Sequence, residues 1–210
     1  MGLEQIYQIT IILIGFTSML IFVSRDWRVS VISLALQYVG VFILVSISWP
    51  LQMAAVKLVA GWMSGAILGL AIAGKPILHQ TENILGERSN KNPIRSKYFS
   101  ESFFRFFAGV MVTLAVVSIS INMQDWVPGI SIYQIIGGLV LIGIGLLQLG
   151  FTSQALNVAL GLLTVLAGFE ILYAGVEISA LVAGLLAGVN LGIALIGAHL
   201  INLHNIRPIP

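Results

Sequence analysis

Long apolar runs separated by short polar stretches constrain this chain more than any other feature. A helix needs about 20 mostly apolar residues to cross the hydrocarbon of a bilayer, and about seven runs meet that need. These runs are Ile6–Val23, Val29–Ile47, Leu51–Ala73, Phe103–Ile121, Ile130–Gly150, Ala155–Ala174 and Ile178–Leu203. Lipid leaves no water for open backbone groups, and the alternating pattern of barrel strands is missing. We therefore expect an all-α integral membrane protein with about seven transmembrane helices.

The composition supports this fold class and excludes several functions. Hydrophobic residues make up 58% of the chain and charged residues 9%, whereas a soluble domain carries about a quarter charged residues. Cysteine is absent, which excludes disulfides, thiolate metal sites and a cysteine nucleophile. The three histidines are scattered, so we expect no metal and no cofactor. No phosphate-binding loop or catalytic triad is visible, so an enzyme that acts alone and a nucleic-acid partner are not expected.

Lysine and arginine residues predict how the chain is oriented. Nearly all of them follow the first, third or seventh span, and the ends of these spans lie on the same side of the membrane. They are Arg25, Arg28, Lys75, Arg88, Lys91, Arg95, Lys97, Arg105 and Arg207. The opposite loops carry none. The positive-inside rule makes the basic side cytoplasmic, so the N-terminus is expected outside and the C-terminus inside. The first run has no basic segment before it and no cleavage site after it, so we expect it to be retained. The prediction is a multi-pass protein of a bacterial cytoplasmic or thylakoid-type membrane.

One polar segment, residues 75–101, divides the chain. It is expected to be either a solvated cytoplasmic linker or a docking surface for a peripheral partner. Residues 1–74 before it form one three-helix membrane unit. After it come a connecting helix with an outer loop, residues 102–129, and a second three-helix unit, residues 130–210.

Two short sequences occur once in each three-helix unit. IYQI stands at Ile6–Ile9 and Ile132–Ile135, and LVAG stands at Leu58–Gly61 and Leu181–Gly184. Both units run from the outside to the inside, so these matches indicate a parallel repeat of three helices. Chance identity in apolar sequence is the alternative.

Glycines follow each LVAG at matching positions. At a spacing of four residues they place a smooth stripe on one face of a helix, which allows a neighbouring helix to come close. The stripe glycines are Gly61, Gly65 and Gly69 in the third span, and Gly184, Gly188 and Gly192 in the seventh. These two spans are therefore expected to be contact helices, either with each other or with another subunit.

Glu170 and Lys57 are the ionisable residues expected inside the membrane. Lys57 lies roughly 9 Å inside the outer face, and Glu170 roughly 6–8 Å, by the helical rise of about 1.5 Å per residue. Glu170 is either a carboxylate that holds helices together or a site that takes up and releases a proton. Lys57 either extends to water from the outer leaflet or is desolvated and paired. Because the two share a depth, we predict that they form an ion pair, which would keep Glu170 ionised.

Two further residues of the seventh span are candidates for an ion pathway. Asn190 lies near its middle and His199 near its cytoplasmic end. A neutral amide such as Asn190 commonly bonds a neighbouring helix, and a histidine such as His199 is commonly an interface anchor.

The last three spans resemble the K-type subunit of respiratory complex I and the C-type subunit of Mrp cation/proton antiporters. The residues that carry the resemblance are GFEI at Gly168–Ile171, where that family has Gly-Leu-Glu-Ile, and the NLGIALIGAHLINLH ending. Over its whole length the chain resembles the E component of hydrogenase-4-type membrane hydrogenases, with SRDWR after the first span and Lys57 in a later one. The resemblance implies that Glu170 matches a carboxylate used for proton movement. Asn190 stands where the family has a second acidic residue.

The resemblance implies a membrane subunit of a multi-subunit complex that translocates protons or sodium ions. Its partners would be other membrane subunits and the lipid bilayer, and any redox chemistry would belong to those subunits. The alternatives are a self-contained small secondary transporter and a purely structural assembly subunit.

Overall fold

The computed structural model describes residues 2–74, 94–123 and 129–206. Seven helices occupy this part of the chain, and each contains a segment long and apolar enough to cross a membrane. They are α1 (Leu3–Val23), α2 (Trp27–Val45), α3 (Leu51–Ala73), α5 (Ile94–Met123), α6 (Ile132–Phe151), α7 (Ala155–Val176) and α8 (Ala180–Ile206). The protein is thus an all-α, multi-pass integral membrane protein, which confirms the predicted fold class.

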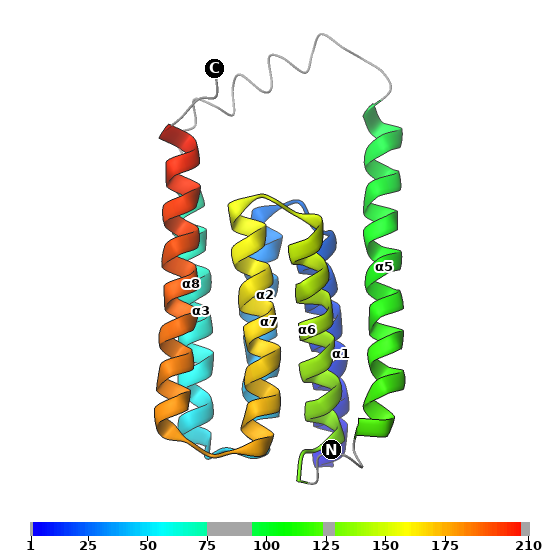
Figure 1. Cartoon of the computed structure of the whole chain (residues 1–210), viewed down its shortest axis with the longest axis vertical. Coiled ribbons are helices and arrows are strands. Elements are labelled where there is room, and N and C mark those ends of the chain that lie inside the picture. Colours follow the sequence, from blue (N-terminus) through cyan, green and yellow to red (C-terminus); the bar gives the residue numbers. More distant parts are fainter. Residues whose placement is uncertain (1, 75–93, 124–128, 207–210) are drawn as a thin grey trace.

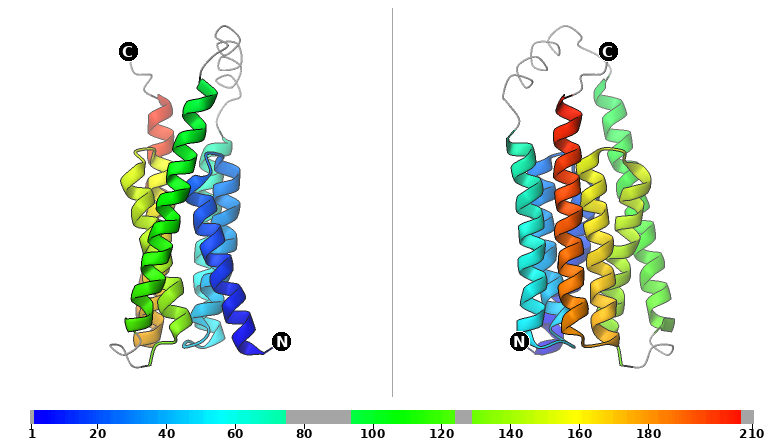
Figure 2. Two further views of the ribbon diagram at one scale, coloured as in Figure 1. Left: turned by 90° about the vertical axis from the view of Figure 1, so that its right-hand side faces the viewer. Right: turned by 60° about the vertical axis from the view of Figure 1, so that its left-hand side comes forward.

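The helices form two layers with one additional helix at the edge (Figure 1). The helices α1, α2 and α3 make one layer, and α6, α7 and α8 make the other. Across the layers α6 packs on α1, α7 on α2 and α8 on α3. Both sets begin at the same end of the bundle and run in the same direction, as predicted for two parallel three-helix sets. The helix α5 packs against α6 and α1 (Figure 2).

We call the end of the bundle where α1 and α3 begin the N-terminal end, and the end where α8 finishes the C-terminal end. Two contacts tie the layers together at the N-terminal end. The Trp49 indole donates a hydrogen bond to the Glu177 carbonyl at 3.0 Å, and its ring meets Tyr173 edge-on. The Gln134 amide donates to the Leu44 carbonyl at 3.0 Å and also bonds Ser48. These contacts join α2 and the turn after it to α6 and α7.

The two IYQI sequences meet in this end of the bundle. Tyr7 of α1 and Tyr133 of α6 have ring centroids 5.6 Å apart. Matching residues of the two layers therefore contact each other at this level.

Close packing of glycines brings α6 and α7 together. A Cβ added to Gly138 would lie 2.9 Å from the Gly168 carbonyl oxygen, so neither position leaves room for a side chain. The contact fixes α7 against α6 two residues before Glu170. Gly168 of the GFEI sequence thus positions the carboxylate that follows it.

The predicted linker at residues 75–101 is shorter than expected. The helix α5 already begins at Ile94, so the last residues of that segment are helical. A helix satisfies its own backbone hydrogen bonds in water as well as in lipid, and it therefore does not have to stop where the apolar run does. Residues 75–93, on which the predicted docking surface depends, lie outside the described part of the chain.

Candidate functional site

A buried ion pair lies between the two layers of helices. The Lys57 ammonium of α3 lies 2.8 Å from Oε1 of Glu170 on α7, and both side chains are 1% exposed. The predicted pairing of these two residues is confirmed. Lys57 is six residues after the start of α3 and Glu170 is six residues before the end of α7, so both lie at the same depth in the bundle.

The lysine reaches a partner on a helix that is not one of the main packing neighbours of its own helix. The helix α3 packs against α2 and α8, while α7 packs against α6, α8 and α2. The four-carbon stem of Lys57 spans the distance from α3 to α7, which a shorter basic side chain would not do. Ala54 and Ala60, one turn to either side of Lys57, are small and buried.

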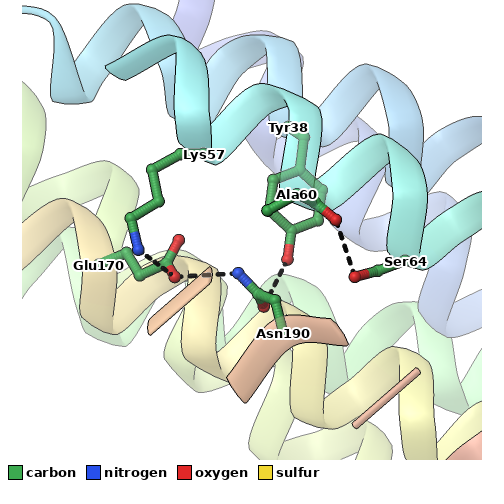
Figure 3. A network of polar contacts seen from close by, with 6 residues as sticks. All are labelled: Tyr38, Lys57, Ala60, Ser64, Glu170 and Asn190. Atoms are coloured by element: carbon green, nitrogen blue, oxygen red, sulfur yellow. Dashed lines mark hydrogen bonds and ion pairs between the residues drawn. The ribbon is translucent and has the colours of Figure 1, made fainter. Parts of the chain in front are cut away.

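Asn190 of α8 extends the ion pair into a network (Figure 3). Its amide nitrogen donates to the same Glu170 oxygen at 3.0 Å. Its amide oxygen accepts a hydrogen bond from the Tyr38 hydroxyl of α2, also at 3.0 Å. All four residues are buried, and they come from α2, α3, α7 and α8. One carboxylate thereby connects four helices and both layers.

The ring of Tyr38 packs directly on Gly61 of α3. A Cβ at Gly61 would meet three atoms of that ring, so the tyrosine can lie flat against α3 only because Gly61 has no side chain. Next to it, the Ser64 hydroxyl donates to the Ala60 carbonyl of its own helix at 2.8 Å. The serine therefore needs no partner from another helix.

The two oxygens of Glu170 have different surroundings. Oε1 accepts from both Lys57 and Asn190, whereas Oε2 is buried and has no hydrogen-bond partner among the described residues. The amide of Gln37, on the helix that carries Tyr38, is likewise buried with neither of its polar atoms bonded within those residues. A carboxylate oxygen with free lone pairs is an acceptor for a proton or a cation. The pair therefore has one oxygen that neutralises the lysine and one that remains available.

The energetic balance of such a site differs from that of a surface ion pair. Desolvation of two charges opposes their attraction, so a buried pair contributes little net stability. Removal of one partner alone is costly, about 3–5 kcal/mol, because the other charge stays buried and unpaired. The ion pair is thus intolerant of single changes without being a strong source of stability.

The remaining candidates do not join this network. His199 lies exposed on α8 near the C-terminal end, about two and a half helical turns beyond Asn190 in the sequence. Among the described residues no three His, Asp or Glu side chains come together in a way that could hold a metal ion.

The two predicted glycine stripes face different surroundings. Gly61 and Gly65 of α3 are buried, and Gly69 next along the stripe is half-buried. Gly184, Gly188 and Gly192 of α8 have no atom within 4 Å of the position a Cβ would take. The helices α3 and α8 do pack on each other, but α8 contributes a different face to the contact.

Sequence reasoning missed Tyr38 as part of the site. A tyrosine in the middle of a transmembrane run carries a hydroxyl that must find a partner in the absence of water, and this was the available signal. Gln37 beside it gave the same indication of a polar face on α2.

The fold and this network define the class of protein: a membrane protein with seven spanning helices in its described part and a charged residue pair enclosed between two layers of helices. Comparisons with models of protein families, with curated proteins and with solved structures found no match to this chain.

Proposed function

We propose that this chain is a membrane subunit of a multi-subunit complex that translocates protons or sodium ions. The complex would belong to the group of complex I, Mrp antiporters and membrane hydrogenases. The observation that supports the proposal is the enclosed ion pair of Lys57 and Glu170. Ionisable residues inside a membrane are rare because of their cost, and where they occur they commonly belong to ion or proton pathways.

The geometry of the pair suits a switch better than a simple proton carrier. A proton that binds to Oε2 of Glu170 neutralises the carboxylate, and the Lys57 ammonium then loses its counter-charge. An unpaired ammonium in a low-dielectric interior is strongly unfavourable, so the lysine must move, lose its proton or attract another anion. Protonation of one group would in this way change the charge distribution at the other. This coupling is what a subunit of an ion-translocating complex requires.

The exposed apolar faces of the bundle are open both to lipid and to partner subunits. The helix α5 exposes Phe103, Phe104, Met111 and Leu114 over much of its length. The outward glycines of α8 would also let another transmembrane helix come close. In the proposed assembly, other membrane subunits and lipid share these faces.

The proposal is tested by isolating the full-length chain from its native membrane under mild detergent, with an affinity tag at one terminus. We expect other membrane proteins to co-purify in fixed proportion and the isolated complex, in vesicles, to move protons or sodium ions. A chain that purifies alone and transports an ion alone in vesicles would instead be a small self-contained transporter.

A double variant separates a role in transport from a role in assembly. Lys57→Met combined with Glu170→Gln removes both charges and leaves none unpaired. We expect the doubly changed subunit to assemble with its partners while ion transport is lost. Full transport by the assembled double variant would show that the pair has only a structural role.

The orientation in the membrane is part of the proposal. The turn after α1 and the turn after α6 lie at the C-terminal end of the bundle, which the positive-inside rule places in the cytoplasm. Cysteines introduced as Ser153→Cys and Glu177→Cys lie at opposite ends, and both native residues are exposed. In intact cells we expect a membrane-impermeant thiol reagent to label only the second variant. Labelling of the first alone would reverse the orientation.

A further inference from the structure

A cavity of about 850 Å³ lies at the C-terminal end of the bundle, away from the ion pair. It is bounded by the turn between α1 and α2, the end of α3, the first turns of α7 and the C-terminal half of α8. In Figure 2 the helix α8 stands between α3 and α7 at this end and extends beyond both. A volume of this size is in the range of small-molecule sites.

The lining of the cavity is polar at its rim and apolar along its wall. The rim carries Arg25 and Trp27 from the turn after α1 and the start of α2, and Ser153, Gln154 and Asn157 from the turn after α6 and the start of α7. The Asn157 amide donates to the Gln154 amide oxygen at 3.2 Å, which holds these two side chains together. All the rim residues belong to interhelical turns or to the first turn of a helix. They therefore lie where a spanning helix leaves the hydrocarbon and meets the headgroups.

The apolar wall of the cavity is continuous with the lipid-facing surface. It includes Leu162, Ile193, Ile196 and Leu200. Of these, Leu162 is 40% exposed, Ile196 63% and Leu200 47%. The wall is thus open to the hydrocarbon on one side and descends from the polar rim along α7 and α8. An occupant must have a polar, hydrogen-bonding head at the rim and a long apolar part along the wall.

We propose that this cavity binds an anionic diacyl phospholipid from the leaflet that surrounds the C-terminal end of the bundle. The guanidinium of Arg25 offers five donors in a planar fork, so it can bind a phosphate oxygen while it keeps another contact. Trp27 has the amphipathic character of residues that sit at the headgroup level. An acyl chain lies along Ile196, Leu200 and Leu162 and leads into the bilayer. A water-soluble anion would leave this wall uncovered, and a zwitterionic lipid would bring its own cation close to Arg25.

The experiment uses the purified full-length chain and native mass spectrometry to count the lipids that remain bound after the detergent is removed in the gas phase. Phosphatidylglycerol and phosphatidylcholine with identical acyl chains are supplied at equal concentration. We expect phosphatidylglycerol to be retained in preference, with about one molecule that survives activation longest. Glycerol phosphate, which has the headgroup chemistry without acyl chains, should not compete with it.

Two matched pairs of variants place the lipid in this cavity. Arg25→Gln should lower the apparent affinity for phosphatidylglycerol about fivefold, because it removes a basic residue of the cavity lining from the anionic headgroup. Arg28→Gln removes the same charge from a residue that stacks on Trp27 but does not line the cavity, and should leave binding unchanged. Ile196→Gln should weaken binding several-fold, whereas Leu195→Gln, equally exposed on the same helix but outside the cavity, should not.

Equal losses within either pair would overturn the proposal, because the bound lipid would then lie elsewhere on the surface. No preference of the unchanged chain for phosphatidylglycerol would also overturn it, as would competition by glycerol phosphate.

Discussion

The helices α3 and α8 carry the same LVAG sequence and the same spacing of glycines, yet they use these residues in opposite ways. In α3 the first glycines of the series, Gly61 and Gly65, are buried, whereas Gly74, which follows the last residue of the helix, is exposed. In α8 the first glycines face outward, and Gly197 at the end is buried. A Cβ at Gly197 would lie 2.8 Å from the Ala159 side chain of α7.

The difference follows from what covers each helix. The helix α3 is packed on one side by α2 and on another by α8, whereas α8 is packed chiefly by α3. The face of α8 that lies inside contains Ala183, Leu186, Asn190 and Ala194, at helical spacings of three and four residues. Gly188 is two residues from Asn190 and so lies on the opposite side of the helix. Similar sequences therefore give the same fold element without giving it the same surroundings.

The largest expected effect comes from changes to the ion pair of Lys57, a charged residue that α3 carries and α8 lacks. Lys57→Met alone or Glu170→Gln alone should lower the free energy of unfolding by about 3–5 kcal/mol, because each leaves a buried polar or charged group without its partner. The double variant should lose less than the sum of the two single losses. Reversible unfolding of the chain in mixed micelles, followed by circular dichroism, measures all three. Strictly additive losses would show that the two side chains are not coupled.

A smaller effect distinguishes the glycines of the two helices. Gly61→Ala puts a methyl group into the Tyr38 ring, and we expect a loss of about 1–3 kcal/mol, the usual cost of overpacking. Gly188→Ala is the matched control, because its Cβ meets nothing within 4 Å. It should leave the free energy of unfolding of the single chain within about 0.5 kcal/mol. The same micelle unfolding assay applies.

The Gly61→Ala and Gly188→Ala variants can also be compared in the intact complex. If Gly188→Ala is harmless in the isolated chain but lowers the yield of the assembled complex, the outward face of α8 contacts a partner subunit. Equal losses for both variants in the isolated chain would contradict the inward and outward assignment.

The sequence was sufficient to predict the seven spans and the ion pair. Both predictions rest on strong constraints: the length of apolar run that a bilayer needs, and the cost of an unpaired charge within it. The depth of Lys57 and Glu170 could be counted from the ends of their spans. These arguments need no knowledge of how the helices are arranged sideways.

The sequence did not show which face of α8 lies inside. Lipid and protein interior are equally apolar, so a smooth glycine stripe is compatible with either. The polar residue gave the better signal, since Asn190 must find hydrogen-bond partners and lipid offers none. Positions at helical spacing from Asn190, such as Leu186 and Ala194, are indeed the buried ones. The cavity near Arg25 could not be foreseen at all, because it depends on the relative lengths and positions of four helices.

The smallest expected effect concerns the hydrogen bond between Tyr38 of α2 and Asn190 on the inner face of α8. Tyr38→Phe removes the hydroxyl that donates to Asn190 but leaves the ring on Gly61 and the bond from Asn190 to Glu170. A single hydrogen bond between transmembrane helices contributes about 0.6 kcal/mol on average, so the variant should unfold slightly more easily and should keep its fold. Tyr7→Phe is the control, since the Tyr7 hydroxyl makes no hydrogen bond within the described residues. Asn190→Ala and the double variant with Tyr38→Phe complete a cycle in the same unfolding assay, and a coupling energy near zero would mean that Asn190 is held by Glu170 alone.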